Sequence, residues 1–91
     1  MNERLIDVAF GLKLPSGAVV SVEGSALVRW RQSGEDPEQL CVFESVTLMD
    51  AKLDGAKLSK TGLIAFVAIY EPLYLEDLKW LAMSSIGCSV T

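Results

Sequence analysis

The chain has 91 residues, of which 51% are hydrophobic, and it contains no histidine. Catalytic arrangements that need a histidine base are therefore excluded, as are zinc sites with histidine ligands. The net charge of −4 argues against general binding to nucleic-acid phosphates or to an anionic membrane surface, both of which require a basic patch.

The chain length is that of one compact domain, residues 1–91. A domain of this size leaves roughly 35–40% of its chain surface exposed after folding. With so many hydrophobic residues, part of that exposed surface must be apolar, and a contiguous apolar patch usually marks an interface. We therefore expect either a homo-oligomer or a complex with another protein.

The longest uninterrupted apolar run, residues 63–70, is far shorter than the ~20 residues of a membrane-spanning helix. Asp7 interrupts the apolar residues near the N-terminus, which is not typical of a signal peptide. We accordingly expect a cytoplasmic protein. In a reducing compartment, Cys41 and Cys88 are expected to be buried free thiols.

The N-terminal third predicts a long β-hairpin. Hydrophobic residues alternate with small or charged residues from Ile6 to Leu14, which is the period of a strand with one buried face. Pro15 and Gly17 supply a turn, and a second alternating segment runs on to Trp30. Pairing Leu14 with Ala18 brings the hydrophobic residues of both strands to the same face.

Two interpretations fit the middle of the chain. In the first, Asp36 caps a helix over residues 37–55. In the second, residues 32–39 form a loop and residues 40–48 form a third strand, because most of them are β-branched, aromatic or thiol-bearing. The dipeptide Asp54-Gly55 is typical of a type I′ hairpin turn and favours the strand.

The apolar run at 63–70 predicts a further strand under either interpretation, and Glu71-Pro72 is expected to end it. Hydrophobic residues then recur near helical spacing, which predicts an amphipathic helix over 73–85 with Gly87 near its end. The predicted fold is therefore α+β: an antiparallel meander of about four strands with a C-terminal amphipathic helix. The alternative is a β-β-α-β-α order with a middle helix at 37–55.

The sequence contains few residues that could act in catalysis. Carboxylate pairs are the only route to acid–base catalysis in this sequence, and such residues in loops or at helix starts usually serve solvation and capping. The candidate carboxylates are Glu35, Asp36, Glu38, Glu71, Glu76 and Asp77. We therefore predict a protein that is not an enzyme, with no catalytic residue, cofactor or metal site.

Three groups of residues are candidates for partner binding. Strand alternation places Arg29 and Arg31 together on the face opposite Trp30, where they can bind carboxylates of a partner or pair locally with Glu23, Glu44 or the loop at 35–38. The second group is the acidic loop, and the third is an aromatic cluster that belongs either to the core or to an anchor site. Their members are Glu35, Asp36 and Glu38, and Tyr70, Tyr74 and Trp80.

The sequence thus favours a small non-enzymatic module or inhibitor that occludes the surface of a partner protein. Compact acidic chains without catalytic motifs are common among inhibitors of phage or mobile-element type. One alternative is a structural or assembly subunit that self-associates and buries its apolar surface between copies. Another is an acidic mimic that fills the nucleic-acid site of a basic protein.

Overall fold

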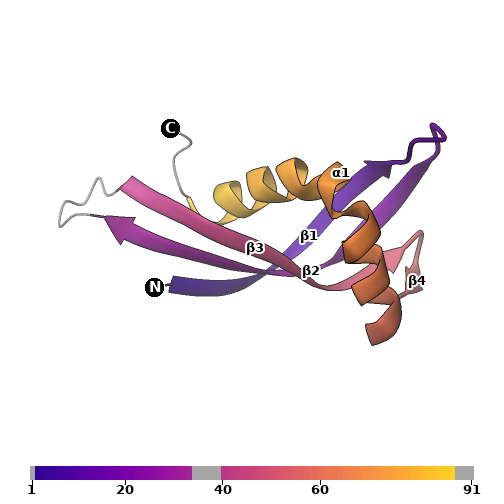
Figure 1. The fold of residues 1–91 in the computed structure, drawn as a ribbon. Coiled ribbons are helices and arrows are strands. Elements are labelled where there is room, and N and C mark those ends of the chain that lie inside the picture. The colour runs from indigo at the N-terminus through magenta and orange to yellow at the C-terminus, as the bar shows by residue number, and fades with distance from the viewer. Residues whose placement is uncertain (1, 34–39, 88–91) are drawn as a thin grey trace.

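The computed structural model describes residues 2–33 and 40–87, with side chains described over 2–31 and 42–87. Four antiparallel strands in the order β1-β2-β3-β4 precede one helix, so the fold is α+β as predicted. The elements are β1 (Asn2–Lys13), β2 (Val19–Ser33), β3 (Leu40–Leu53), β4 (Ala56–Lys57) and α1 (Lys60–Ile86). The sheet curls into a half-barrel, and the second half of α1 lies along its concave face (Figure 1).

The hairpin of β1 and β2 has the predicted register over its whole length. Phe10 lies opposite Val22, and Val8 lies opposite Gly24. The N–H of Leu14 donates to the carbonyl of Ala18 at 2.8 Å. Gly17 takes a positive φ of 92°, which is the conformational role expected of a turn glycine. The alternating pattern was sufficient to predict this hairpin because a one-residue slip would turn every core side chain outward.

Residues 40–53 form a strand, so the middle helix at 37–55 is wrong. β3 pairs with β2 from Ser33 opposite Leu40 to Val22 opposite Leu53. Two register shifts interrupt this pairing and leave Glu44 and Met49 as extra residues on β3. Bulges of this kind bend a strand and increase its twist, which favours the curled shape of the sheet.

The turn at Asp54-Gly55 is also confirmed. Leu53 pairs with Ala56 across it, and Asp54 and Gly55 have φ values of 50° and 87°, as a type I′ turn requires. Asp54 further ties the turn to β2, because its N–H donates to the carbonyl of Ser21 at 2.8 Å. Its carboxylate accepts a hydrogen bond from the N–H of Ser21 at 2.9 Å.

The predicted strand at 63–70 is wrong, because these residues are helical. β4 contains only two residues, and α1 begins at Lys60. The hydroxyl of Ser59 accepts a hydrogen bond from the N–H of Gly62 at 3.0 Å and so caps the helix. Leu58 and Leu63, which flank this cap, both pack against the core in the positions of a hydrophobic staple.

Pro72 lies inside α1 and does not end it. Proline has no N–H to donate to the carbonyl four residues earlier, and its ring crowds that carbonyl, so a helix bends there. The bend separates a first half of α1 near β4 from a second half that lies along the sheet (Figure 1). α1 ends near the predicted position, where Gly87 has a φ of 75° and its N–H donates to the carbonyl of Met83.

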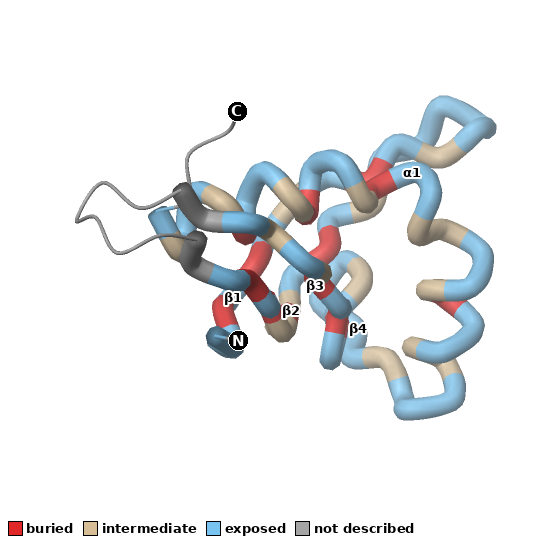
Figure 2. The backbone as a smooth tube through the Cα atoms, turned by 60° about the vertical axis from the view of Figure 1, so that its left-hand side comes forward, coloured by how far each residue is buried: buried red, intermediate tan, exposed pale blue. Residues whose placement is uncertain are grey.

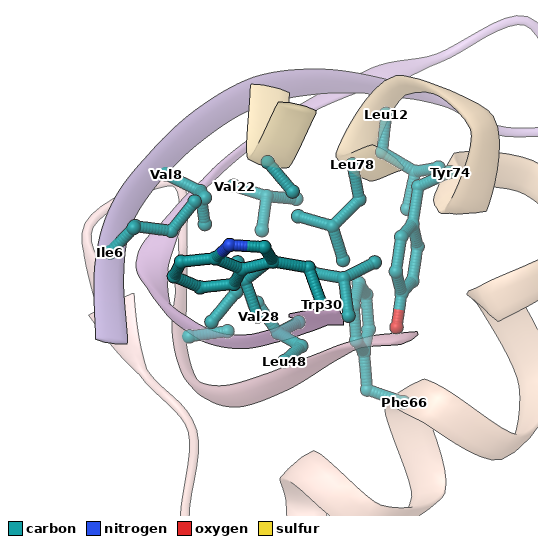
Figure 3. Close-up of a cluster of buried hydrophobic side chains, with 14 residues drawn as sticks. Ile6, Val8, Leu12, Val22, Val28, Trp30, Leu48, Phe66, Tyr74 and Leu78 are labelled. Atoms are coloured by element: carbon teal, nitrogen blue, oxygen red, sulfur yellow. The ribbon is translucent and has the colours of Figure 1, made fainter. Parts of the chain in front are cut away.

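One hydrophobic core fills the space between the sheet and α1. Figure 2 shows the buried positions recurring along the strands and along the inner side of the helix. Trp30 lies among the aliphatic side chains of β1, β2 and β3 in Figure 3, with Tyr74 and Phe66 beside this cluster. The helix contributes Phe66, Tyr74, Leu78 and Ala82 to the core.

Candidate protein-binding surfaces

Arg29 and Arg31 lie on the exposed outer face of β2, as the alternation predicted. Each one reaches a different neighbouring strand. Nε of Arg29 lies 3.1 Å from Oε2 of Glu3 on β1, and Arg31 forms an ion pair with Glu44 on β3. Exposed pairs of this kind stabilise a fold by about 0–1 kcal/mol, so the guanidinium groups can exchange these carboxylates for those of a partner at little cost.

The acidic loop with Glu35, Asp36 and Glu38 lies outside the described residues, as does Cys88. The side chain of Cys41 also falls outside the described set.

Tyr74 belongs to the core and is no surface anchor. Its residue surface is only 1% exposed, and its ring stacks on Phe66 with centroids 5.7 Å apart and packs against Phe10 at 5.4 Å. The hydroxyl has no hydrogen-bond partner among the described residues. Burial, with a smaller contribution from the carboxylate of Glu71, raises the pKa of Tyr74 to about 12.

The two other aromatic candidates lie in different environments. Tyr70 is half-buried and packs on Phe66 with ring centroids 5.2 Å apart. Trp80 is 56% exposed and lines a hollow between β1 and α1. The structure therefore does not unite Tyr70, Tyr74 and Trp80 in one exposed surface.

The sequence interpretation missed an exposed group of side chains on α1. Ile64, Ile69 and Leu73 are 66%, 64% and 48% exposed. Ile69 and Leu73 are one helical turn apart on the same side of α1, and we call these two residues the projecting apolar surface, whereas Ile64 lies on a different side of the helix. Ile69 precedes Pro72 in α1, and Leu73 follows it directly. The sequence signal that could have revealed this helix is the cap and staple at Leu58-Ser59, followed by Leu63.

Most charged side chains near the projecting apolar surface are carboxylates. Residues 61–78 contain the carboxylates of Glu71, Glu76 and Asp77 and no lysine or arginine. The next basic side chain, Lys79, places Nζ 3.7 Å from the carboxylate of Glu76. This part of α1 therefore combines exposed aliphatic side chains with more carboxylates than basic groups.

Two open hollows mark the described surface. The larger, of about 580 Å³, lies on the outer face of the sheet among residues that include Asp7, Glu23 and Asp50. These carboxylates are exposed, and the Asp50 carboxylate accepts hydrogen bonds from the hydroxyl and N–H of Ser25 at 2.7 Å and 3.1 Å. The smaller, of about 290 Å³, lies between Ala9 and Phe10 of β1 and Trp80, Leu81, Asp77 and Ser84 of α1.

Within residues 2–33 and 40–87, no helix has the length and apolar character needed to cross a membrane. Comparison with protein-family models, with curated proteins and with solved structures gives no match to this chain.

Proposed function

We propose that this chain is a non-enzymatic protein-binding module that acts by occluding the surface of a partner, as an inhibitor of phage or mobile-element type would. The observation that supports this most directly is the projecting apolar surface. Ile69 is about two-thirds exposed and Leu73 about half exposed, although Phe66 and Tyr74 on the same helix are buried in the core. Large aliphatic side chains held out to solvent on a helix are typical of a surface that another protein covers.

The helix that carries this surface is already held in place before any partner binds. The rings of Phe66, Tyr70 and Tyr74 follow one another along the inner side of α1, and Phe10 of β1 packs on the last of them. A binding element fixed in advance loses little conformational entropy on association, which favours affinity.

The partner we propose is a protein with an apolar groove bordered by basic side chains. The groove would take Ile69 and Leu73, one turn apart on α1, in the manner of helix-in-groove recognition. Basic residues at its border would face Glu71 and Asp77, and Glu76 is shared with Lys79. Electrostatic attraction of this kind raises the association rate and weakens with added salt.

The test is affinity capture with the chain as bait, followed by reconstitution with the purified captured protein. The variant Ile69→Ser/Leu73→Ser removes two side chains of the projecting apolar surface and leaves the core residues intact. Val19→Ser is the matched control, because Val19 is 67% exposed at the far end of the β1–β2 hairpin.

The proposal requires a stoichiometric complex that forms with the wild type and with Val19→Ser, is lost in the double variant and weakens as salt increases. A captured protein that binds the double variant equally well would overturn it. So would capture in which no protein is enriched over a bait-free control.

The two other functions carry different support. Self-association is supported by a specific feature, the position of β1 at the edge of the sheet. The acidic mimic depends on the loop with Glu35, Asp36 and Glu38, outside the described residues. On the described outer face, Glu3 and Glu44 are paired with arginines, so we place the mimic last among the proposals.

A further inference from the structure

β1 is an edge strand that is unusually long and regular. It pairs with β2 through twelve consecutive residues, from Asn2 opposite Trp30 to Lys13 opposite Val19, with no register shift. It contains no proline. Natural proteins usually protect a sheet edge by shortening it, bulging it or placing proline in it, because a free edge can pair with another chain.

The register shows which backbone groups of β1 point away from the sheet. The N–H of Leu14 donates to Ala18, and hydrogen-bonded pairs alternate along an antiparallel ladder. The even-numbered residues of β1 therefore bond to β2. The N–H and C=O groups of its odd-numbered residues, from Glu3 to Lys13, point to the free edge.

The opposite side of the sheet is protected in ways that β1 is not. β3 carries the two bulges at Glu44 and Met49, and β4 pairs with its end at Lys52 and Leu53. The N–H of Leu58 also donates to the carbonyl of Ala51 at 2.9 Å. Among the described strands, β1 is thus the edge best shaped to accept a further strand.

We propose that β1 is a dimerisation edge, on which β1 of a second copy of this chain pairs antiparallel with Val8 opposite Val8 on a two-fold axis. An isologous two-fold contact between two identical edges makes an antiparallel pair. This inference concerns a surface other than the projecting apolar surface and does not depend on it.

Side chains on the outer face select this register. With Val8 on the axis, Glu3 lies opposite Lys13 of the second copy, and Leu5 lies opposite Gly11, where no side chain competes for space. Glu3 would then lie between Lys13 of the second copy and Arg29, with which it is already paired. Opposite charges directly across a ladder stabilise it, and like charges destabilise it.

The neighbouring registers are less favourable. Moving the axis to Asp7 sets two aspartates directly opposite each other, which is repulsive. Moving it to Ala9 removes the pairing of Glu3 with Lys13 and shortens the overlap of the two strands. Odd shifts are excluded, because they would place core side chains opposite solvent-facing ones.

The hollow between β1 and α1 provides apolar surface beside this edge. Phe10 lines it from β1, and Trp80 and Leu81, 56% and 36% exposed, line it from α1. A two-fold axis through Val8, perpendicular to the sheet, places both helices on the same face of the joined sheet. Trp80 and Leu81 then face the corresponding residues of the second copy, which adds apolar contact to the backbone pairing.

The first experiment is sedimentation of the full chain from micromolar to millimolar concentration, combined with amide hydrogen exchange. We expect a monomer–dimer equilibrium in which the odd-numbered amides of β1 gain protection as the dimer forms. The even-numbered amides, bonded to β2, should be protected throughout. A chain that stays monomeric, or a dimer that leaves the odd-numbered amides unprotected, would overturn the proposal.

Charge reversal tests the partners across the axis without changing the core. Glu3→Lys and Lys13→Glu each place like charges opposite each other in their own homodimers, and each should weaken dimerisation by roughly tenfold. Mixing the two variants places opposite charges together again and should restore a heterodimer near wild-type affinity. If the mixed variants form a heterodimer no more tightly than either variant forms its homodimer, Glu3 does not face Lys13.

The distance between spin labels on the two copies tests the strand register independently. In a background with Cys41→Ser and Cys88→Ser, a label at Leu5→Cys should show a separation of about 20 Å between the two copies, from a rise of about 3.4 Å per residue. An axis at Asp7 or at Ala9 predicts about 14 Å or about 27 Å instead. Either of those distances would reject the register with Val8 on the axis.

Discussion

Gly24 lies directly against the backbone of Asp50. A Cβ atom at Gly24 would be 2.8 Å from the carbonyl carbon of Asp50 and closer still to its oxygen. This approach occurs beside the register shift at Ser25, where Met49 is the extra residue on β3. The absence of a side chain at Gly24 therefore lets β2 and β3 approach closely at the bulge that helps the sheet curl.

We expect Gly24→Ala to lower the free energy of unfolding by about 2–3 kcal/mol, because the contact it creates is with backbone and not with a flexible side chain. Gly11→Ala is the matched control. The Cβ added at Gly11 meets only a side-chain carbon of Val19, at 3.4 Å, so stability should change by less than about 1 kcal/mol. Urea unfolding followed by tryptophan fluorescence measures both. Equal stability losses in the two variants would contradict this account of Gly24.

Tyr74→Phe should leave the protein as stable as the wild type or raise its free energy of unfolding by about 1 kcal/mol. The reason is that the Tyr74 hydroxyl is buried with no hydrogen-bond partner among the described residues, which carries a desolvation cost. The stacking on Phe66 is retained by phenylalanine. A loss of more than about 1 kcal/mol at neutral pH would mean that the hydroxyl has a favourable partner.

Stability should also depend on the ionisation of Tyr74 at alkaline pH. The pKa of Tyr74 is raised to about 12, so the folded protein keeps this proton at pH values where the unfolded chain has released it. The stabilisation is complete below pH 10 and is lost as pH rises from 10 towards 12, amounting to about 2–3 kcal/mol in all. Relative to Tyr74→Phe, the wild type should therefore lose stability over this range. Parallel pH profiles for the two proteins would contradict the raised pKa.

Arg4 connects the start of β1 to the end of α1. Its guanidinium lies 5.8 Å from the ring centroid of Trp30 and donates to the carbonyl of Ser85 at 3.3 Å. Arg4→Met keeps the aliphatic stem but removes the charge, and we expect a loss of about 1 kcal/mol. Lys79→Met, at an exposed helix position paired only with Glu76, should cost less than about 0.5 kcal/mol. Thermal unfolding compares the two, and equal shifts would show that Arg4 has no specific role.

The sequence predicted the fold class correctly but misassigned one segment. Ile64, Val67 and Ile69 are β-branched, and Phe66 and Tyr70 are aromatic, so residues 63–70 carry the composition of a buried strand. The helix prevails because Ser59 caps it and because Phe66, Tyr70 and Tyr74 are spaced by four residues. That spacing places all three rings on the side of α1 that faces the core.

The candidate site was predicted only in part. Arg29 and Arg31 lie on the outer face as expected, since strand alternation alone determines which face a side chain takes. For Tyr74 the sequence left two alternatives, the core or a surface anchor, and the structure places it in the core. The exposure of Ile64 and Ile69 was not foreseen. That exposure depends on the helical conformation of residues 60–72, where a strand was predicted over 63–70.

Local patterns in the sequence determined the β1–β2 hairpin, the third strand, the turn at Asp54-Gly55 and the end of the helix at Gly87. In each case, alternation or the φ preference of one or two residues was enough. Tertiary packing decided the conformation of residues 60–72, where strand propensity and a capped helix compete and only the core could favour one. It also decided which sheet edge can accept another strand. β3 is protected by its two bulges and by its pairing with β4, whereas β1 is regular and pairs only with β2 among the described strands.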